Sequence, residues 1–177
     1  IVQGQYESLP KAQQMLEINT IDELDGRLLA AISANPRSGI QELSNRLGIT
    51  RATVYSRLEK LESAGVITGF GPDVDFGKLG YGVTAFITIE LQQGRFKDVI
   101  PVLDKMPQVI EAHALAGEGD IICRVVARNN DHLMEIVQTI LSTKGVRRSR
   151  TAISLEQFIS HRSLPLVLHV SGASATT

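Results

Sequence analysis

The sequence predicts an α+β protein with a helical N-terminal part, a linker, and a C-terminal part in which strands and helices alternate. Before about residue 65, apolar residues recur at every third or fourth position, which is the period of an amphipathic helix. From residue 83 onward, segments with a period of two alternate with helical segments in the order βαββαβ. Three glycines between residues 77 and 82 separate the two patterns and indicate a hinge.

The first predicted helix covers residues 22–34. Leu24, Leu28 and Ile32 lie on one apolar stripe. Acidic residues at the start suit the positive end of the helix dipole, and Asn35-Pro36 ends the helix. We expect this helix to pack beneath the next two and to complete a three-helix core.

Two short helices are predicted between residues 39 and 67. Leu43 and Leu47 form an apolar pair on the first of them, and an i, i+4, i+7 stripe marks the second: Val54, Leu58 and Leu61. A tight turn at Gly48 joins them, because glycine tolerates the backbone conformation that such a turn needs. Thr50 is suited to cap the second helix.

The outward face of the second helix is small and polar, with arginines at its edges. Such a face suits a helix lying in the major groove of DNA, so the pair indicates a helix-turn-helix. Thr53 and Ser56 are expected to reach base edges, and Arg57 to hold a phosphate. Gln41 is expected to meet the DNA backbone from the preceding helix. The residues predicted to contact DNA are Gln41, Thr50, Arg51, Thr53, Tyr55, Ser56 and Arg57.

The alternative for this segment is an ordinary helical hairpin with a polar outer face. Its polar side chains would then be solvated, and Tyr55 would pack at the edge of the domain. Residues 66–75 favour the helix-turn-helix, because they are β-branched and punctuated by glycine, as in a strand or wing. Residues 66–82 are therefore predicted to form a strand and hinge linker.

The C-terminal part is predicted to form a ferredoxin-like sheet with both helices on one face. Strands are predicted at residues 83–91, 109–115, 121–127 and 146–159, and helices at residues 95–106 and 131–141. The other face is expected to be apolar, with Phe86, Ile110 and Ala112 or their neighbours, and Ile153 or Ala152. An apolar face without a helical cover predicts at least a homodimer.

A glycine-rich turn at residues 116–120 is the second candidate site. Closely spaced glycines expose backbone amides that can bind a carboxylate, while Glu118 or Asp120 can meet an ammonium group. A free amino acid carries both groups. The alternative is a plain β-hairpin turn. The candidate effector-binding residues are Ala116, Gly117, Glu118, Gly119 and Asp120.

Composition sets bounds on the functional class. The chain has 177 residues, a net charge of −1 and a pI near 6.5, so it carries no global basic signal. Residues 21–72 contain six basic and six acidic residues, and a dimer with two recognition helices would offset this weak electrostatic attraction to DNA. The chain contains neither an apolar run near 18 residues nor a signal-peptide pattern, so we expect a cytoplasmic protein.

The residues that usually perform catalysis are scattered. Four histidines have no metal-ligand spacing, and the single cysteine, Cys123, is expected to be a buried strand residue. We therefore expect no catalytic residue, no metal and no cofactor other than a possible amino-acid effector. Residues 1–20 form an N-terminal extension without strong periodicity, and residues 161–177 form a C-terminal tail, predicted to be disordered from residue 171.

The chain resembles the Lrp/AsnC (feast/famine) family of prokaryotic transcription regulators over about residues 21–160. The resemblance rests on the following segments: Leu24-Asp25, Leu28-Leu29, Glu42-Leu43-Ser44, Leu47-Gly48-Ile49-Thr50, Val54-Tyr55-Ser56-Arg57-Leu58, Leu61-Glu62-Ser63-Ala64-Gly65-Val66-Ile67 and Leu115-Ala116-Gly117-Glu118-Gly119-Asp120.

The resemblance implies a helix-turn-helix DNA-binding domain over residues 21–65 and a ligand-sensing and oligomerisation domain over residues 83–160. It also implies binding to double-stranded DNA, and dimers that assemble into octamers or similar rings around which DNA wraps. Family members bind an effector near the glycine turn, between dimers. Many relatives carry a larger residue where this chain has Gly119, so the effector of this chain is left open.

Two alternatives to a sequence-specific regulator are kept. One is a mainly architectural protein that wraps DNA with little sequence preference. The other is a tetrapyrrole enzyme similar to the sirohaem decarboxylases, which resemble these regulators in both domains. That enzyme would need His113 or another histidine to face a cofactor cavity.

Overall fold

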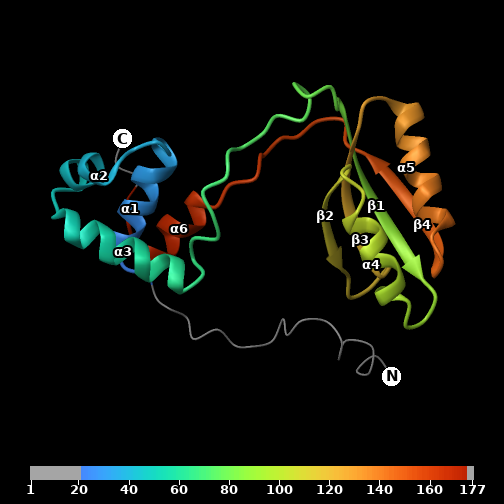
Figure 1. Ribbon diagram of the computed structural model, residues 1–177, viewed down its shortest axis with the longest axis horizontal. Coiled ribbons are helices and arrows are strands. Elements are labelled where there is room, and N and C mark those ends of the chain that lie inside the picture. The colour runs from blue at the N-terminus through green and yellow to red at the C-terminus, as the bar shows by residue number, and fades with distance from the viewer. Residues whose placement is uncertain (1–20, 175–177) are drawn as a thin grey trace. The chain divides into compact units, whose positions relative to one another are not determined.

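The computed structural model describes residues 21–174. These residues form two compact units (Figure 1). The helical unit comprises residues 21–72 together with residues 160–174, and the sheet unit comprises residues 73–159. The chain therefore leaves the helical unit, builds the sheet unit, and returns to complete the helical unit.

The helical unit begins with three helices, as the sequence predicted: α1 (Glu23–Ala34), α2 (Ile40–Leu47) and α3 (Arg51–Ser63). Asp22 and Asp25 form a capping box that satisfies backbone amides at the start of α1. Gly48 ends α2 with a φ of 67°, a left-handed conformation that explains the glycine in this tight turn. Thr50 caps α3 by accepting a hydrogen bond of 3.1 Å from the amide of Thr53.

The core of the helical unit confirms the predicted inward stripes of α2 and α3. Its buried apolar residues are Ile21, Leu28, Ala31, Leu43, Leu47, Val54 and Leu61. Leu58 and Ile32 are partly buried against them. Burial of each such side chain contributes about 1.5–3 kcal/mol relative to exposure, so this small core holds the three helices in one arrangement.

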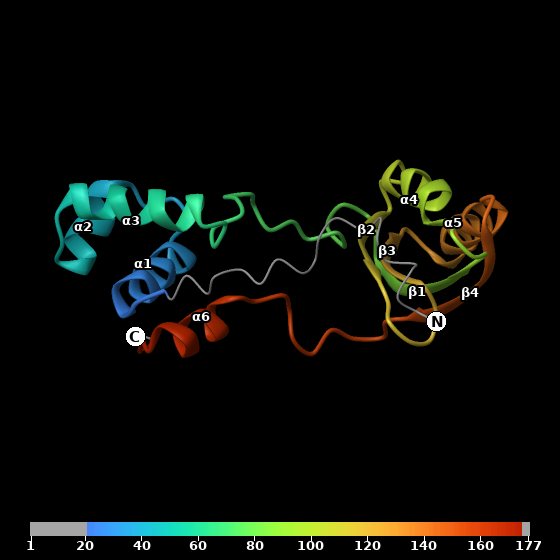
Figure 2. The ribbon, with the colours of Figure 1, turned by 90° about the horizontal axis from the view of Figure 1, so that it is seen from below.

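The C-terminal tail contains a further helix, so the prediction of a simple tail over residues 161–177 was wrong. Helix α6 (Leu164–Ser171) packs on α1 in both views (Figures 1 and 2). Ser171 and Ala173, predicted to be disordered, are buried. The sequence pattern of this short segment is ambiguous without its packing partner. Residues 1–20 and 175–177, on which the other terminal predictions fall, lie outside the described residues.

The sheet unit has the predicted βαββαβ order. Its elements are β1 (Val83–Leu91), α4 (Phe96–Asp104), β2 (Val109–Ala114), β3 (Ile121–Ala127), α5 (Asn130–Ser142) and β4 (Val146–Ile153). The four strands form one antiparallel sheet in the order β2-β3-β1-β4. Figure 2 shows α4 and α5 on the same face of the sheet, which is the predicted ferredoxin-like arrangement.

The final strand is shorter than predicted. It ends at Ile153, not near residue 159, because its partner β1 begins at Val83. The amide of Ser154 makes a hydrogen bond of 2.8 Å to the carbonyl of Thr84, and the apolar residues that follow have no strand to pair with. Leu155 and Phe158 are 98% and 88% exposed in the single chain.

The linker between α3 and β1 contains no strand, so the strand predicted at residues 66–75 is wrong for the single chain. A strand needs a hydrogen-bonded neighbour, and none of the described segments pairs with this one. The predicted hinge is a compact turn, in which the amide of Tyr81 donates to the carbonyl of Phe76 over 2.9 Å. Phe70 and Val74 are exposed.

The core of the sheet unit lies between the sheet and its two helices. Its buried residues are Ala85, Ile87, Ile89, Leu91, Val99, Leu103, Ile121, Cys123, Val125, Ala127, Leu133, Ile136 and Ile140. The alternation of buried residues along β1 confirms the period of two that predicted this strand. Cys123 is a buried strand residue, as predicted.

We expect the Cys123 thiol to be inert in the folded protein. Burial raises the pKa of this thiol to about 11, so little thiolate forms near pH 8. Labelling with a chromophoric disulfide at pH 8 should therefore be slow in buffer and complete within minutes in denaturant. Rapid labelling of the folded chain would contradict the burial of this residue.

The sheet face opposite the helices, here called the open face, is more polar than the sequence predicted. Phe86 and Ala152 are paired in register on it. Ala112 and Ile153 lie on the helix-covered face, because their partners Cys123 and Ala85 do. Much of the open face is charged or polar, with the following members: Thr84, Thr88, Glu90, Glu111, His113, Arg124, Arg148 and Arg150.

Candidate nucleic-acid interface and effector turn

The outward face of α3 is open to solvent over its first two turns. Arg51, Ala52, Tyr55 and Ser56 are exposed, while Val54 points into the core. The side chain of Tyr55 is 62% exposed, so it does not pack at the domain edge, which was the alternative for this residue. This face presents small and hydrogen-bonding groups beside one arginine, as a helix that enters the major groove requires.

Thr53 is held by the cap of the helix. Its hydroxyl lies 2.8 Å from the hydroxyl of Thr50, which also accepts from the backbone amide of Thr53. A hydroxyl can donate and accept at once, so the pair can still bind a further partner. The arrangement places the Thr53 side chain in one orientation at the start of α3.

Arg57 does not offer its guanidinium to solvent as the sequence predicted. It forms ion pairs with Asp22 and with Asp25, the latter at 3.0 Å. Lys60, one turn further along α3, reaches Asp25 at 2.8 Å. The predicted role of Arg57 as a phosphate clamp is therefore corrected for the free chain, in which this side chain joins α3 to α1.

The carboxylate of Asp25 is fully buried, whereas Arg57 and Lys60 are partly exposed. A buried carboxylate is expensive unless it is paired and hydrogen-bonded, and both conditions are met here. The hydrogen bond to Asp22 raises the pKa of Arg57, and the same bond lowers the pKa of Asp22. We call Asp22, Asp25, Arg57 and Lys60 the acidic anchor.

The acidic anchor was missed in the sequence, although a signal for it exists. Asp25 lies four residues after Ile21 and three before Leu28, on the apolar stripe of α1. A carboxylate at an inward position needs a cation on a facing element. Arg57 and Lys60 have the helical spacing of three that lets both approach one group.

Helix α2 contributes a side chain and free backbone groups. Gln41 is exposed and donates to Asn45 over 2.9 Å. Gly39 precedes the helix without a side-chain cap. The first amides of an uncapped helix remain available to an anion such as a DNA phosphate.

Within residues 21–72, three exposed arginines have no ion-pair partner among residues 21–174: Arg37, Arg46 and Arg51. Only Arg51 was predicted as a DNA contact. Arg37 and Arg46 were not predicted because they lie outside the second helix of the motif, which is the helix expected to enter the major groove. Unpaired cations are the groups that can replace counterions on a phosphate backbone.

The candidate effector turn folds back on the end of β1. The amide of Asp120 donates to the carbonyl of Ile89 over 2.9 Å, and its carboxylate accepts from the amide of Leu91 over 2.7 Å. Glu118 forms an ion pair with Arg150 on β4. The hydrogen bond that Arg150 donates to Glu118 within this ion pair holds the pKa of the Glu118 carboxyl below its usual range. Both acids of the turn therefore have partners within the chain.

Gly119 is required by the path of the turn. Its φ is 85°, and a Cβ at this position would lie 2.4 Å from the Cγ2 of Thr88. Gly117 also has a positive φ, of 133°, but a Cβ there would meet no atom within 4 Å. At Gly117 the turn has the open surroundings of a plain hairpin connection. At Gly119 it packs closely against Thr88 of β1, where a side chain would not fit.

Comparison with known proteins identifies the two parts of the chain. Residues 21–68 match the model of a winged helix-turn-helix DNA-binding domain, and residues 84–164 match the Lrp/AsnC ligand binding domain. An HTH-type transcriptional regulator of Pyrococcus furiosus, itself uncharacterised, is 32% identical over 77% of this chain and 92% of its own length. The chain belongs to the Lrp/AsnC family.

Solved structures of this family agree with the fold. AsnC of E. coli matches with a TM-score of 0.76 and 31% identity, over 82% of this chain and 99% of that one. A transcriptional regulator of Neisseria meningitidis, solved in complex with L-Met, matches with a TM-score of 0.76 and 27% identity, over 83% and 97%. The regulator FL11 of Pyrococcus horikoshii is 27% identical over 82% of this chain and 97% of its length. This Lrp/AsnC chain is a DNA-binding transcriptional regulator with a ligand-binding domain.

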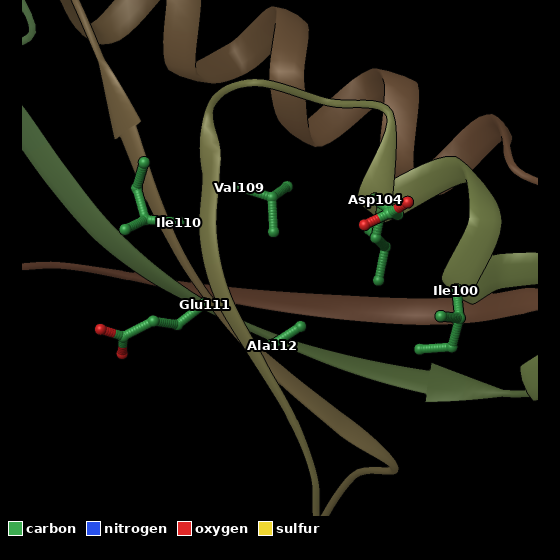
Figure 3. Close-up of a pocket in the computed structure, with 7 residues that line it drawn as sticks. Ile100, Asp104, Val109, Ile110, Glu111 and Ala112 are labelled. Atoms are coloured by element: carbon green, nitrogen blue, oxygen red, sulfur yellow. The ribbon is translucent and has the colours of Figure 1, made fainter. Parts of the chain in front are cut away.

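A hollow of about 190 Å³ lies between α4 and β2 of this Lrp/AsnC protein (Figure 3). Ile100 and Asp104 of α4 border it, opposite Val109 and Ala112 of β2. In Figure 3 the side chain of Glu111 points to the other side of the strand. None of the residues of the glycine turn lines the hollow, and its lining includes no cation to bind the carboxylate of an amino acid.

Neither a group of metal-binding side chains nor a histidine lining the hollow is present in the described part of this Lrp/AsnC chain. Among residues 21–174, no three or more His, Cys, Asp or Glu side chains are grouped to hold a metal. His113 lies on the open face, with its side chain 68% exposed, and does not line the hollow. No helix within these residues is long and apolar enough to cross a bilayer.

Proposed function

We propose that the protein is a dimeric, sequence-specific regulator whose affinity for its operator is set by a free amino acid. The exposed face of α3, with Tyr55 and Ser56 at its centre, carries the proposal. The helix-turn-helix match supports it, since the recognition helix of that motif reads the major groove.

The proposed DNA contacts follow from the geometry of the helical unit. Tyr55, Ser56 and Thr53 face the base edges. Arg51 and the first amides of α2 bind phosphates, and Gln41 supports them from α2. Thr50 acts through its cap on α3. Arg57 is proposed to bind Asp22 and Asp25 of the acidic anchor and not a DNA phosphate.

A second copy of the chain is the proposed cover for the exposed apolar residues of the linkers. Leu155, Phe158 and Ile159 follow β4, and Phe70 and Val74 precede β1, all exposed in the single chain. Large apolar side chains exposed in this number favour association with a partner that covers them. A symmetric dimer would present two copies of α3 to successive major grooves about 34 Å apart. Assembly of dimers into octamers or similar rings is part of this proposal.

The effector is proposed to bind at residues 116–120. The amides around the two glycines and the guanidinium of Arg150 can bind a carboxylate, and Glu118 can meet an ammonium group. The Neisseria relative that was solved with L-Met supports an amino acid as the class of effector. Binding would compete with the ion pair between Glu118 and Arg150.

The test is retention of a genomic fragment library at physiological salt, with and without a mixture of free amino acids. We expect a few promoter fragments to be enriched, and the enrichment to change with amino acids. Arg51→Ala and Tyr55→Ala should each weaken binding of these fragments by about 1–3 kcal/mol. Lys97→Ala, which removes an exposed cation from the sheet unit, is the matched control and should change nothing.

Each other outcome has a definite meaning. Retention without enrichment would favour the architectural alternative. The absence of any retention would contradict DNA binding by this chain. We propose that the protein has no catalytic role. Absorbance near 400 nm in the purified protein would contradict this and favour the tetrapyrrole alternative.

The salt dependence of operator binding should be moderate. Each copy offers three exposed arginines without ion-pair partners within residues 21–72, so a dimer offers six. Counterion release then predicts that log K falls with log salt concentration with a slope of about −5. Fluorescence anisotropy between 50 and 300 mM salt measures this slope. A value near −10 would mean that many further cations contact the DNA, as in the architectural alternative.

A further inference from the structure

Helix α6 lies outside the part of the chain that defines the family. The match to the ligand-binding domain ends at residue 164, where α6 begins. Yet α6 belongs to the helical unit, not to the sheet unit that precedes it in the sequence. The DNA-binding unit of this protein is therefore built from both ends of the described chain.

The contact between α6 and α1 is unusually close. Val167 packs against the core of the helical unit, and Ser171 and Ala173 are buried. A Cβ built on Gly26 of α1 would lie 2.0 Å from the Oγ of Ser171 and 2.9 Å from the Cβ of Ala173. Only glycine fits at this position while α6 is seated. A glycine inside a helix destabilises it relative to alanine, so the contact is the physical reason for Gly26.

The seat of α6 adjoins the acidic anchor. Gly26 directly follows Asp25, whose buried carboxylate binds Arg57 and Lys60 of α3. Helix α1 thus contacts α6 at Gly26 and binds the recognition helix at the preceding residue, Asp25. Any displacement of α1 at Gly26 moves the group that orients α3.

We propose that α6 is a clamp that positions the recognition helix through α1. The proposal rests on the proposed DNA-binding function. The helical unit is joined covalently to the sheet unit by two segments, one before β1 and one after β4. Changes in the sheet unit therefore have two connections through which to reach α3, one of them ending in α6. Gly26 and Ser171 are positioning residues, since they contact neither DNA nor effector.

The test uses the full chain and two measurements. Gly26→Ala should unseat α6 and lower the melting temperature of the helical unit by about 5 °C or more. Circular dichroism measures this melting temperature. Ser171→Gly removes the Oγ and Cβ that the new methyl group meets, so the double variant Gly26→Ala/Ser171→Gly should recover part of the loss. Gly69→Ala is the control, because a Cβ there meets no atom within 4 Å and its backbone is not in the left-handed region.

The second measurement is affinity for an enriched fragment at a temperature where every variant is folded. Gly26→Ala should weaken binding several-fold, and the double variant should restore part of it. A lower melting temperature with unchanged affinity would overturn the positioning role, and an unchanged melting temperature would overturn the seating of α6. If the wild type binds no DNA, the proposed function fails, and the positioning role fails with it. The melting temperatures still decide whether α6 is seated on α1.

Discussion

Replacing Asp25 by asparagine should lower the free energy of unfolding of the helical unit by about 2–3 kcal/mol. The change keeps the shape of the side chain and removes the charge that binds Arg57 and Lys60. Breaking a buried ion pair usually costs about 3–5 kcal/mol when the remaining charge stays buried. Here the two cations are 28% and 43% exposed and can be hydrated, which reduces the cost. Urea denaturation measures the change.

Asp22→Ala is the matched control for Asp25→Asn. Asp22 is half-exposed, and its removal costs the cap of α1 and one partner of Arg57, about 1 kcal/mol. The two substitutions should also differ in their effect on operator binding. Asp25→Asn is expected to weaken it because α3 loses the ion pairs of Arg57 and Lys60 to Asp25 of α1, although Asp25 touches no DNA in the proposed complex. Equal effects of the two substitutions on stability would contradict the buried role of Asp25.

Gly119→Ala should destabilise the sheet unit by about 2–4 kcal/mol. An alanine at a φ of 85° is strained by about 1–2 kcal/mol, and its methyl group overlaps the Cγ2 of Thr88 at 2.4 Å. The two contributions can be separated. Thr88→Ala removes the overlapping methyl group, so the double variant Gly119→Ala/Thr88→Ala should lose less stability than the sum of the two single variants.

Gly117→Ala provides the comparison within the same turn, because it introduces backbone strain but no overlap. Calorimetric unfolding of the four variants measures these differences. A cost for Gly119→Ala no greater than that for Gly117→Ala would show that the turn moves away from β1 easily. The effector response should then survive the substitution, whereas a rigid turn predicts that it is lost.

Local patterns predicted most of the elements. The helical period of residues 22–65 and the alternation of residues 83–91 are set by which side chains avoid water, and this choice is visible in the sequence alone. Gly48 and Thr50 act within a few residues of their own positions, so the turn and the cap of α3 were predicted correctly. The exposed centre of the predicted recognition helix follows from the same stripe.

Long-range pairing decided the remainder. Arg57 appeared to be free because its partners lie 32 and 35 residues earlier, and only the packing of α1 on α3 brings them together. The open face appeared apolar because the register of β2 and β4 against their neighbours was unknown, and a shift of one residue exchanges the two faces. Helix α6 appeared to be a tail because its partner surface on α1 lies at the other end of the described chain.

The sequence by itself therefore determined the order of the elements within the sheet unit, the helix-turn-helix, its outward face and the glycine turn. Each of these depends on residues close together in the chain, for which hydrophobic period, turn chemistry and caps act directly. Tertiary structure alone decided that Arg57 binds the acidic anchor, that Gly119 packs against Thr88, and that α6 completes the DNA-binding unit. These outcomes depend on which distant groups meet, because a buried charge needs a partner and a close contact needs space, wherever in the chain the other group lies.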